Sequence, residues 1–263
     1  MKRNLLFILR DWASGFLHWR YWWNFALLDI SLRYRRSILG PFWLTISFLM
    51  TAAGLAVVYS ALFNMEIRHY IPYLVAGLSS WGYVNSLINE GCTALTRQAG
   101  TMRDQNLPIM AHAIRAVVSN TVIFGHNLLV VAATVLIAGT PITWSTLFAL
   151  PALALLACNG VWITLIFGLL CARYRDLPPL VSVITNLLFL ITPVFWLRDM
   201  LGPRGFIADF NPLYHFVELL RAPMLGSMPP LHTIIIMLSI TAFGWLLTLL
   251  IAMRLQTRIA YWV

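Results

Sequence analysis

Charged residues are scarce in this chain of 263 amino acids. Asp, Glu, Lys and Arg together make up 10% of the sequence, whereas apolar residues make up 60%. A soluble domain contains about 25% charged residues and needs them to cover its surface. The apolar excess must therefore face lipid, and the composition excludes a chain built of one or two soluble domains.

Lysine is nearly absent, because Lys2 stands alone against 17 arginines. A Walker A phosphate-binding loop requires a lysine after a glycine-rich turn, and no such turn precedes Lys2, which excludes an ATP site of that kind in this chain. The net charge of +9 would also suit a nucleic-acid-binding protein. The basic residues, however, lie between uncharged stretches rather than in one patch, so we expect a membrane and no nucleic-acid partner.

Motifs for metal binding and for nucleophilic catalysis are lacking as well. The three cysteines form no CxxC pair, the six histidines form no HExxH motif, and no GxSxG sequence occurs. We expect the cysteines to be small buried hydrophobic residues and His126 to be a hydrogen-bonded core residue. The sequence therefore predicts that this chain is no enzyme and holds no metal or other cofactor.

Carboxylates deep within the apolar stretches are also almost absent. Glu90 lies at the end of one stretch, and the other acidic residues fall in loops or near the interface. A carrier driven by protons or sodium ions normally has a carboxylate or a broken helix near the middle of the membrane. A transport function would therefore need an energy source outside this chain.

The sequence does contain a series of long uncharged stretches. They cover residues 37–65, 69–89, 116–172, 177–197 and 222–253. A transmembrane helix needs about 20 mostly apolar residues, and the third stretch is long enough for two helices joined by a turn at 139–141. The sequence predicts an all-α membrane protein with six transmembrane helices.

The arginines indicate how these helices are oriented. With six spans both termini lie on one side, and 14 of the 18 lysines and arginines fall on that side. Because positive residues concentrate in cytoplasmic segments, we expect both termini in the cytoplasm. The N-terminal sequence lacks the apolar core of a signal peptide, so we expect it to be retained. Residues 1–36 then form a cytoplasmic region, and residues 37–263 form the six-span domain.

Residues 11–36 combine tryptophans with arginines. This composition is typical of a helix that lies in the headgroup layer, with its rings at the interface and its guanidinium groups on lipid phosphates. An aromatic element of a soluble core is the alternative. The residues expected at the interface are Trp19, Trp22, Trp23, Arg33, Arg35 and Arg36.

The cytoplasmic segment 93–107 places polar side chains around Leu95 and Met102. This pattern favours a short amphipathic helix, broken or bent at Gly100, although an ordinary solvated loop has a similar composition. The polar residues are Arg97, Gln98, Arg103, Asp104, Gln105 and Asn106. We interpret the segment as a contact surface for a cytoplasmic partner.

The external segment 196–230 contains a second short helix. Asn211 and Pro212 form a helix-start signal, an apolar stripe follows at positions 213, 216, 217 and 220, and Pro223 is expected to stop the helix. The polar residues off the stripe are Tyr214, Glu218 and Arg221. Such a helix is too short to cross a bilayer, so we expect a re-entrant element. Its Glu218 and Arg221 can pair with each other or hold neighbouring segments in a closed state.

Several short motifs occur in an order that resembles one family. They are LRYRRSILGPFW at 32–43, Asn-Leu-Pro at 106–108, Arg-Tyr-Arg-Asp at 173–176, Thr-Pro-Val-Phe-Trp at 192–196, Asn-Pro-Leu at 211–213 and Glu-Leu-Leu-Arg at 218–221. They extend over nearly the whole chain, which resembles the membrane subunit of ABC exporters for O-antigen, capsule and teichoic-acid polymers. The motifs do not indicate which polymer is carried.

The resemblance implies a function and a set of partners. It implies a permease in the bacterial inner membrane that forms a homodimer and binds two cytoplasmic ATP-binding subunits, which would carry the ATP and magnesium. The dimer interface would form a channel for a lipid-linked polysaccharide. By the same resemblance, 93–106 would be the coupling helix, 11–36 the interfacial helix, and 196–230 the external gate, whose candidate residues are Asn211, Tyr214, Glu218 and Arg221.

Aromatic residues are the candidates for lining the channel, because rings offer apolar contact to sugars without tight hydrogen bonds. The candidates are Phe42, Trp43, Tyr59, Trp81, Tyr83, Phe195 and Trp196. Packing in the core or in an interfacial belt is the alternative for each ring. A permease for drugs or small lipids is the main alternative function, and a membrane-embedded transferase is a second one that lacks a visible catalytic cluster.

Overall fold

The computed structural model describes residues 2–33, 35, 37, 39–40, 42–104, 107–256, 259 and 262, and these ranges contain helices and no strand. The N-terminal part contains α1 (Lys2–Leu17) and α2 (Trp19–Arg33). The long helices are α3 (Phe42–Leu62), α4 (Ile67–Arg97), α6 (Ile109–Ala138), α7 (Ala149–Arg173), α8 (Leu177–Ile191) and α11 (Leu231–Leu255). The shorter elements are α5 (Ala99–Asp104), η1 (Trp144–Phe148), η2 (Arg198–Arg204), α9 (Phe206–Asp209) and α10 (Pro212–Met224).

A helix forms in each of the six places where the sequence predicts a span. Four helical segments in the described part of the chain are long and apolar enough to cross a membrane, namely α3, α6, η1 with α7, and α11. The α4 helix is long but carries polar residues towards its end, and α8 has only 15 residues. The structure therefore contains four candidate spans by length and composition, together with two further helices at predicted positions.

The α8 helix is shorter than the uncharged stretch 177–197 that predicts it. It ends at Ile191, and residues 192–197 are not helical. Pro193 explains this end, because a proline disfavours the helical conformation of the residue before it. The α8 helix therefore leads into a non-helical segment, Thr192–Leu197, whose backbone groups need partners elsewhere.

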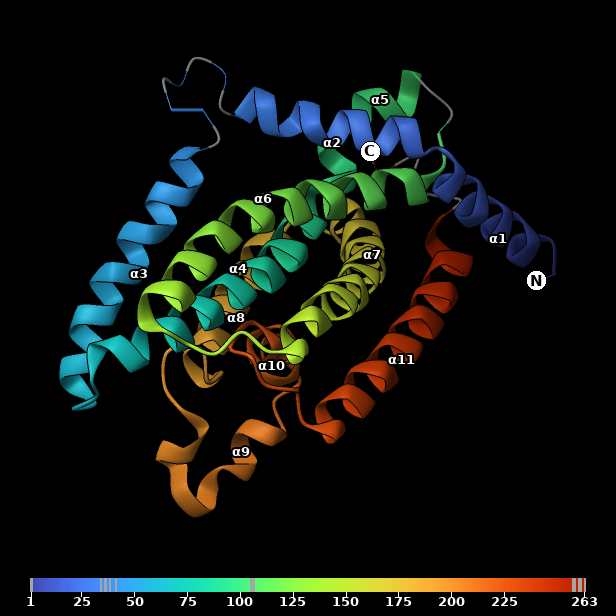
Figure 1. Ribbon diagram of the computed structural model, residues 1–263. Helices are drawn as coiled ribbons and strands as arrows, with labels where there is room; N and C mark the ends of the chain where they lie inside the picture. The colour runs from blue at the N-terminus through green and yellow to red at the C-terminus, as the bar shows by residue number, and fades with distance from the viewer. Residues whose placement is uncertain are drawn as a thin grey trace.

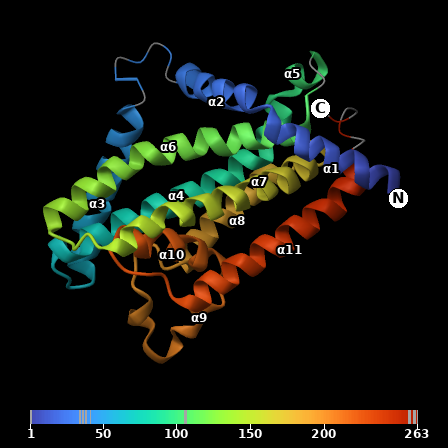
Figure 2. The ribbon, with the colours of Figure 1, turned by 45° about the vertical axis from the view of Figure 1, so that its right-hand side comes forward.

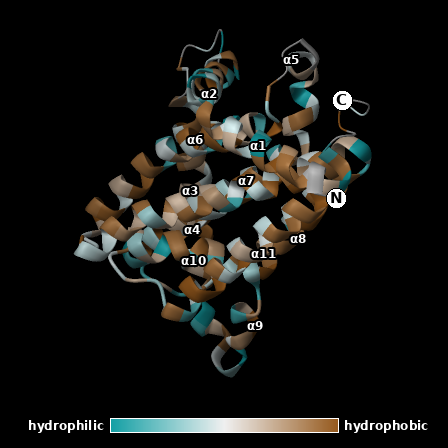
Figure 3. Cartoon of the chain, turned by 90° about the vertical axis from the view of Figure 1, so that its right-hand side faces the viewer, coloured by the Kyte–Doolittle hydropathy of each residue, from teal (hydrophilic) through white to brown (hydrophobic). Residues whose placement is uncertain are grey.

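The α4 helix lies at the centre of the bundle, where it packs against α6, α7, α10, α3 and α8 (Figures 1 and 2). It approaches α7 closely at glycines: a Cβ atom on Gly91 would lie 3.1 Å from the Cα of Thr164. The α3 helix lies at the edge of the bundle (Figure 1). Hydrophobic residues follow the long helices, and hydrophilic residues gather at the end with α2 and α5 and near α9 (Figure 3). These two ends are called the α5 end and the α9 end.

The N-terminal region forms two helices, where the sequence predicts one interfacial helix over 11–36. The helix is interrupted at His18, whose ring contacts the carbonyl of Ser14. The α1 helix packs on α6 and α11, with Trp12 at the edge of the Trp245 ring, and α2 packs on α6. Trp19, Trp23, Arg33 and Arg35 are exposed and Trp22 is half-buried, while Arg36 lies outside the described residues. The location in the headgroup layer remains a prediction.

Two local predictions of helix ends are wrong. The break in segment 93–107 lies at Gln98, because α5 includes Gly100 and the buried Gln98 side chain is held by His112. The α10 helix continues through Pro223 to Met224, because the N–H groups of residues 225 and 226 still bond to carbonyls of the last turn. Gly226, at φ +78°, then ends the helix in a left-handed conformation.

Gly226 provides a test of this packing. An added Cβ would lie 2.2 Å from the Pro141 carbonyl oxygen and would also be strained at positive φ. We expect Gly226→Ala to reduce the free energy of unfolding by about 1–3 kcal/mol. Gly125→Ala is the matched control, since its Cβ would meet nothing within 4 Å in the middle of α6. That control should be neutral or slightly stabilising. Equal unfolding transitions of the two variants in detergent would contradict the close packing of Gly226 against Pro141.

Candidate functional site

The predicted gate residues meet the non-helical segment Thr192–Leu197 in one buried cluster. Arg221 donates from Nη1 to the carbonyl oxygen of Pro193 at 2.6 Å. The Tyr70 hydroxyl donates to the Phe195 carbonyl, and the Tyr73 hydroxyl donates to the Trp196 carbonyl at 3.1 Å. Buried carbonyls that leave a helix need such partners. Side chains of α4 and α10 thus replace the bonds that a continuous α8 would have made.

Arg221 is the centre of this cluster, and its side chain is 2% exposed. Its Nε donates to Glu218 at 3.0 Å, Nη2 donates to the same carboxylate oxygen, and the guanidinium lies 4.2 Å from the Tyr73 ring centroid. The predicted pairing of these two side chains is confirmed. A buried charge is costly unless it is paired and fully hydrogen-bonded, and Arg221 has both kinds of partner.

Asn211 connects the start of α10 to the same segment. Its Oδ1 accepts from the N–H of Leu213 at 3.0 Å, which confirms the predicted N-cap, and its Nδ2 donates to the Thr192 hydroxyl at 2.9 Å. On the α4 side, a Cβ on Gly77 would lie 2.5 Å from the Val194 carbonyl oxygen. A glycine therefore lets the segment touch the backbone of α4. The Arg221 cluster is defined here as Tyr70, Tyr73, Gly77, 192–197, Asn211, Glu218 and Arg221. The fourth predicted gate residue, Tyr214, is buried beside it with its ring edge-on to His215 at 5.3 Å.

Four of the candidate lining aromatics gather around this cluster. Tyr59 lies 4.8 Å from Phe195 between ring centroids, Phe195 lies 5.5 Å from Phe189, and Phe189 lies 5.5 Å from Trp81. The Trp196 indole donates to the Leu190 carbonyl at 3.2 Å. These rings form a connected aromatic group from α3 across α8 to α4, and Trp81 is its buried end.

The other candidate aromatics lie elsewhere. Tyr83 is buried between α4 and α6, where its hydroxyl bonds to Thr121 at 2.8 Å and its ring packs on Phe124. Phe42 and Trp43 are exposed at the start of α3. The lining role of all seven rings remains a prediction.

An ion pair supports the cluster from the α9 side. Arg198 of η2 donates to both carboxylate oxygens of Asp209, at 2.9 and 2.5 Å. The hydrogen bonds from Arg198 hold the pKa of Asp209 below its usual value. His215 of α10 contacts the Asp209 carbonyl at 2.8 Å and Thr233 of α11 at 3.1 Å, and burial lowers its pKa. The α9, α10 and α11 helices are thereby joined.

A second polar cluster lies at the α5 end. Arg115 of α6 donates from Nε and Nη2 to Asp29 of α2, at 2.7 and 2.6 Å, and from Nη1 to the Tyr21 hydroxyl at 3.3 Å. His112 bonds to Tyr21 at 3.0 Å and to Gln98 at the α4–α5 junction. These five residues are called the Arg115 cluster, and they connect α2, α6 and the start of α5.

The candidate coupling residues are only partly covered by the structure. Gln98 belongs to the Arg115 cluster, and the exposed Arg97 lines a neighbouring cavity of about 380 Å³ with Arg33 and Glu90, whose charged groups lie 3.0 Å apart. Arg103 and Asp104 lie in α5, but their side chains are outside the described part. Gln105 and Asn106 lie outside the described residues.

The predicted histidine and cysteine roles are also visible. His126 bonds to the Val122 carbonyl at 2.9 Å, which confirms the predicted hydrogen bond, but the residue is half-buried and does not lie in the core. Cys92 and Cys171 are buried, and Cys158 is half-buried. Within the described residues no three His, Cys, Asp or Glu side chains gather as a metal site.

Sequence reasoning missed Tyr70 and Tyr73, which supply two of the three side-chain bonds to backbone carbonyls of the 192–197 segment. The partners of these hydroxyls lie 125 and 123 residues further along the chain, so no local pattern reveals them. A signal did exist in the Pro193 motif, because a break in an apolar stretch frees carbonyls that must find donors. Two tyrosines spaced three apart in another apolar stretch are suitable donors.

Comparison with known proteins gives a family. Residues 20–225 match the model of the "ABC-2 type transporter" family. The chain is also similar to proteins named "O-antigen export system permease protein RfbA". One from Klebsiella pneumoniae is 24% identical over 187 residues, and one from Myxococcus xanthus is 27% identical over 193 residues. Each alignment covers 70% of this chain and 72% of the relative.

The Arg221 cluster predicts a large difference between two arginines. Removing the buried charge with Arg221→Met leaves Glu218 and the Pro193 carbonyl unpaired, so we expect a loss of about 3–5 kcal/mol in the free energy of unfolding. Arg198→Met breaks a more exposed pair and should cost at most about 1 kcal/mol. Denaturant unfolding of both variants in detergent measures the difference. Similar losses would show that the buried Arg221–Glu218 pair contributes no more to stability than the more exposed Arg198–Asp209 pair.

Proposed function

Because the chain belongs to the ABC-2 type transporter family, we propose that it is the permease subunit of an ABC exporter that moves a lipid-linked polysaccharide, of the O-antigen or capsule type, across the bacterial inner membrane. The family forms the membrane part of transporters and is not itself catalytic, so this chain is a multi-pass membrane protein and not an enzyme. The resemblance read from the sequence motifs is thereby confirmed. The names of the relatives support the choice of substrate.

The proposed assembly has six spans in each of two copies, with both termini in the cytoplasm. The helices α4 and α8 complete the four candidate spans, and the distribution of arginines supports the orientation. Two cytoplasmic ATP-binding subunits bind ATP and magnesium and supply the energy, since this chain has no Walker A motif. In this orientation the α5 end faces the cytoplasm, and the α9 end faces the other side.

One observation carries the mechanism: α4 is continuous from Ile67 to Arg97. Its 31 residues rise about 1.5 Å each, or roughly 46 Å in all. One end holds Tyr70 and Tyr73 in the Arg221 cluster, and the other end leads through Gln98 into α5. A displacement of α5 by the ATP-binding subunits is therefore transmitted to the α9 end along one continuous helix.

The gate of this exporter is the 196–230 segment, which includes α9 and α10. Arg221 and Glu218 hold α10 against the 192–197 segment, which keeps the exit closed while the cluster is intact. In a dimer two such gates would meet near the symmetry axis. Re-entry of α10 into the membrane from the α9 side agrees with its burial and with its 13 residues, which are too few to cross.

The polymer pathway lies between the two copies and is lined by the exposed and half-buried rings, namely Phe42, Trp43, Tyr59, Phe195 and Trp196. Trp81 and Tyr83 are buried inside one copy. They could reach the polymer only if α4 separates from α8 and α6. In the closed state Trp81 and Tyr83 pack inside the copy and stabilise the helices that carry the lining rings.

Polymer accumulation tests the function. A deletion strain should accumulate lipid-linked polysaccharide on the cytoplasmic side, and the wild-type gene should restore export. A copy with Arg103→Glu should be made at normal levels yet fail to restore export, because a reversed charge at a partner interface costs about 2–5 kcal/mol. Unchanged polysaccharide in the deletion strain, with increased sensitivity to a drug, would favour the alternative exporter.

Labelling from one side of the membrane tests the topology. After replacement of the three native cysteines, a membrane-impermeant maleimide should label Phe210→Cys, at the exposed α9 end, from the periplasm. The control Tyr174→Cys, exposed between α7 and α8, should be labelled only after the membrane is opened. The opposite pattern would reverse the orientation, and labelling of both from the periplasm would exclude the six-span arrangement.

A further inference from the structure

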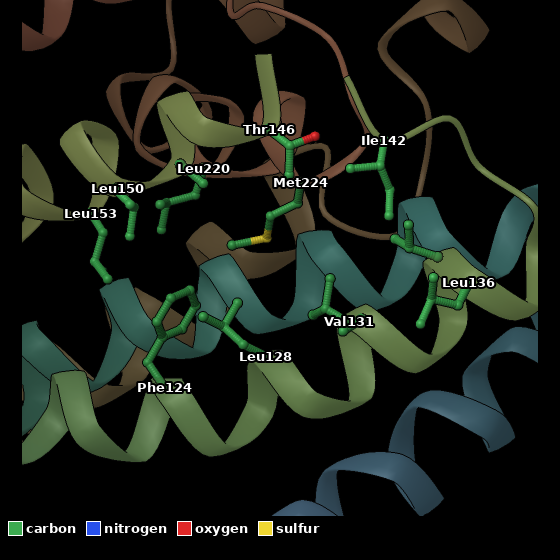
Figure 4. Close-up of a pocket in the computed structure, with 13 residues that line it drawn as sticks. Phe124, Leu128, Val131, Leu136, Ile142, Thr146, Leu150, Leu153, Leu220 and Met224 are labelled. Carbon is green, nitrogen blue, oxygen red and sulfur yellow. The ribbon is translucent and has the colours of Figure 1, made fainter. Parts of the chain in front are cut away.

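An apolar cavity of about 280 Å³ lies between α6, η1, α7 and α10 (Figure 4). Phe124, Leu128 and Val131 of α6 line one side of the cavity, and Leu220 and Met224 of α10 face them (Figure 4). Thr146 carries the one hydroxyl among the lining side chains. Water in a cavity needs two to four polar partners, and an engineered apolar cavity of about 150 Å³ stays dry and binds benzene. This larger cavity is therefore suited to hydrocarbon and not to water.

The position of the cavity indicates where the hydrocarbon comes from. Two of its walls, α6 and η1 with α7, are candidate membrane spans. The exposed side chains of Leu136 and Leu150 line its opening and continue the apolar outer surface of these helices. Trp144, 89% exposed at the start of η1, marks the edge of this surface, where tryptophan is typical of the membrane interface. The cavity thus opens sideways into the bilayer, just below the headgroup layer.

We propose that this cavity binds an acyl chain of a phospholipid from the leaflet on the η1 side, and that the chain packs against Leu220 and Met224 of α10. Leu220 precedes Arg221, and consecutive residues lie about 100° apart around a helix, so the bound chain and the Arg221 cluster contact adjoining faces of α10. Thr143 of the η1 region also donates to the Gly226 carbonyl at 2.6 Å, which fixes the end of α10 beside the cavity. The lipid therefore stabilises the position of α10. This inference rests on membrane insertion and is independent of the polysaccharide.

Photolabelling tests the proposal. The purified chain with its co-encoded partners is reconstituted in vesicles that contain a phosphatidylethanolamine with a diazirine near the end of one acyl chain, irradiated, and mapped by peptide mass analysis. Met224 and Leu220 line the cavity and are buried, so a probe on the outer surface has little access to them. We expect label on peptides that contain 220–224 as well as on the open surface of α6.

Two adjacent alanines on α6 provide matched variants. Ala132 lines the cavity and Ala133 does not, and both are exposed. Ala132→Trp should fill the opening and reduce labelling of 220–224 at least five-fold, whereas Ala133→Trp should leave it unchanged. Absence of label at 220–224 in the wild type, or equal labelling in the two variants, would overturn the proposal.

Other occupants give different results. An excess of polyprenyl phosphate without a diazirine should not reduce labelling of 220–224 by the phospholipid probe. A strong reduction would assign the cavity to an isoprenoid tail instead. A photoreactive residue introduced at Ala132 should react with lipid, and reaction with a second copy of the chain would instead identify a protein interface. Either of these two results would contradict the phospholipid assignment.

Discussion

The need to pair backbone carbonyls in an apolar environment shapes the α9 end of this protein. Residues 192–197 leave the helix inside an otherwise apolar stretch, and a membrane protein cannot leave such carbonyls without donors. Tyr70, Tyr73 and Arg221 supply the donors. Because these side chains come from α4 and α10, their hydrogen bonds join α4, α10 and the 192–197 segment that follows α8.

The burial of Arg221 follows from the same requirement. A neutral donor could bond the Pro193 carbonyl, but the guanidinium also bonds Glu218 and covers the Tyr73 ring, so one side chain joins α10, α4 and the 192–197 segment. The charge then needs its carboxylate, which explains why the off-stripe face of α10 is buried like the apolar one. An amphipathic pattern normally indicates one solvent-exposed face. In this helix the polar face instead marks contact with a second, polar surface of the protein.

Much of the fold could be predicted from the sequence, because the signals were local. Uncharged stretches located six of the helices, Asn211 indicated the start of α10, and spacing of three residues indicated the Glu218–Arg221 pair. The failures were of two kinds. At Gln98 and Pro223, contacts or capping elsewhere overrode a local rule about glycine or proline. Tyr70 and Tyr73 depend on contacts between distant segments, and helical periodicity carries no information about those.

The ion pairs near the two ends of α4 differ in how deeply they are buried. At the α9 end, α4 is tied to a charge that is almost fully buried, and breaking such a contact is costly. At the α5 end, the direct ion pair between α2 and α4 joins Arg33 and Glu90, which are more exposed, and exposed pairs contribute at most about 1 kcal/mol. The α9 end of α4 is therefore joined to α10 and the 192–197 segment by a buried, charged contact, whereas its direct polar contact with α2 is a more exposed pair. Gln98, where α4 meets α5, is held instead by His112 of α6.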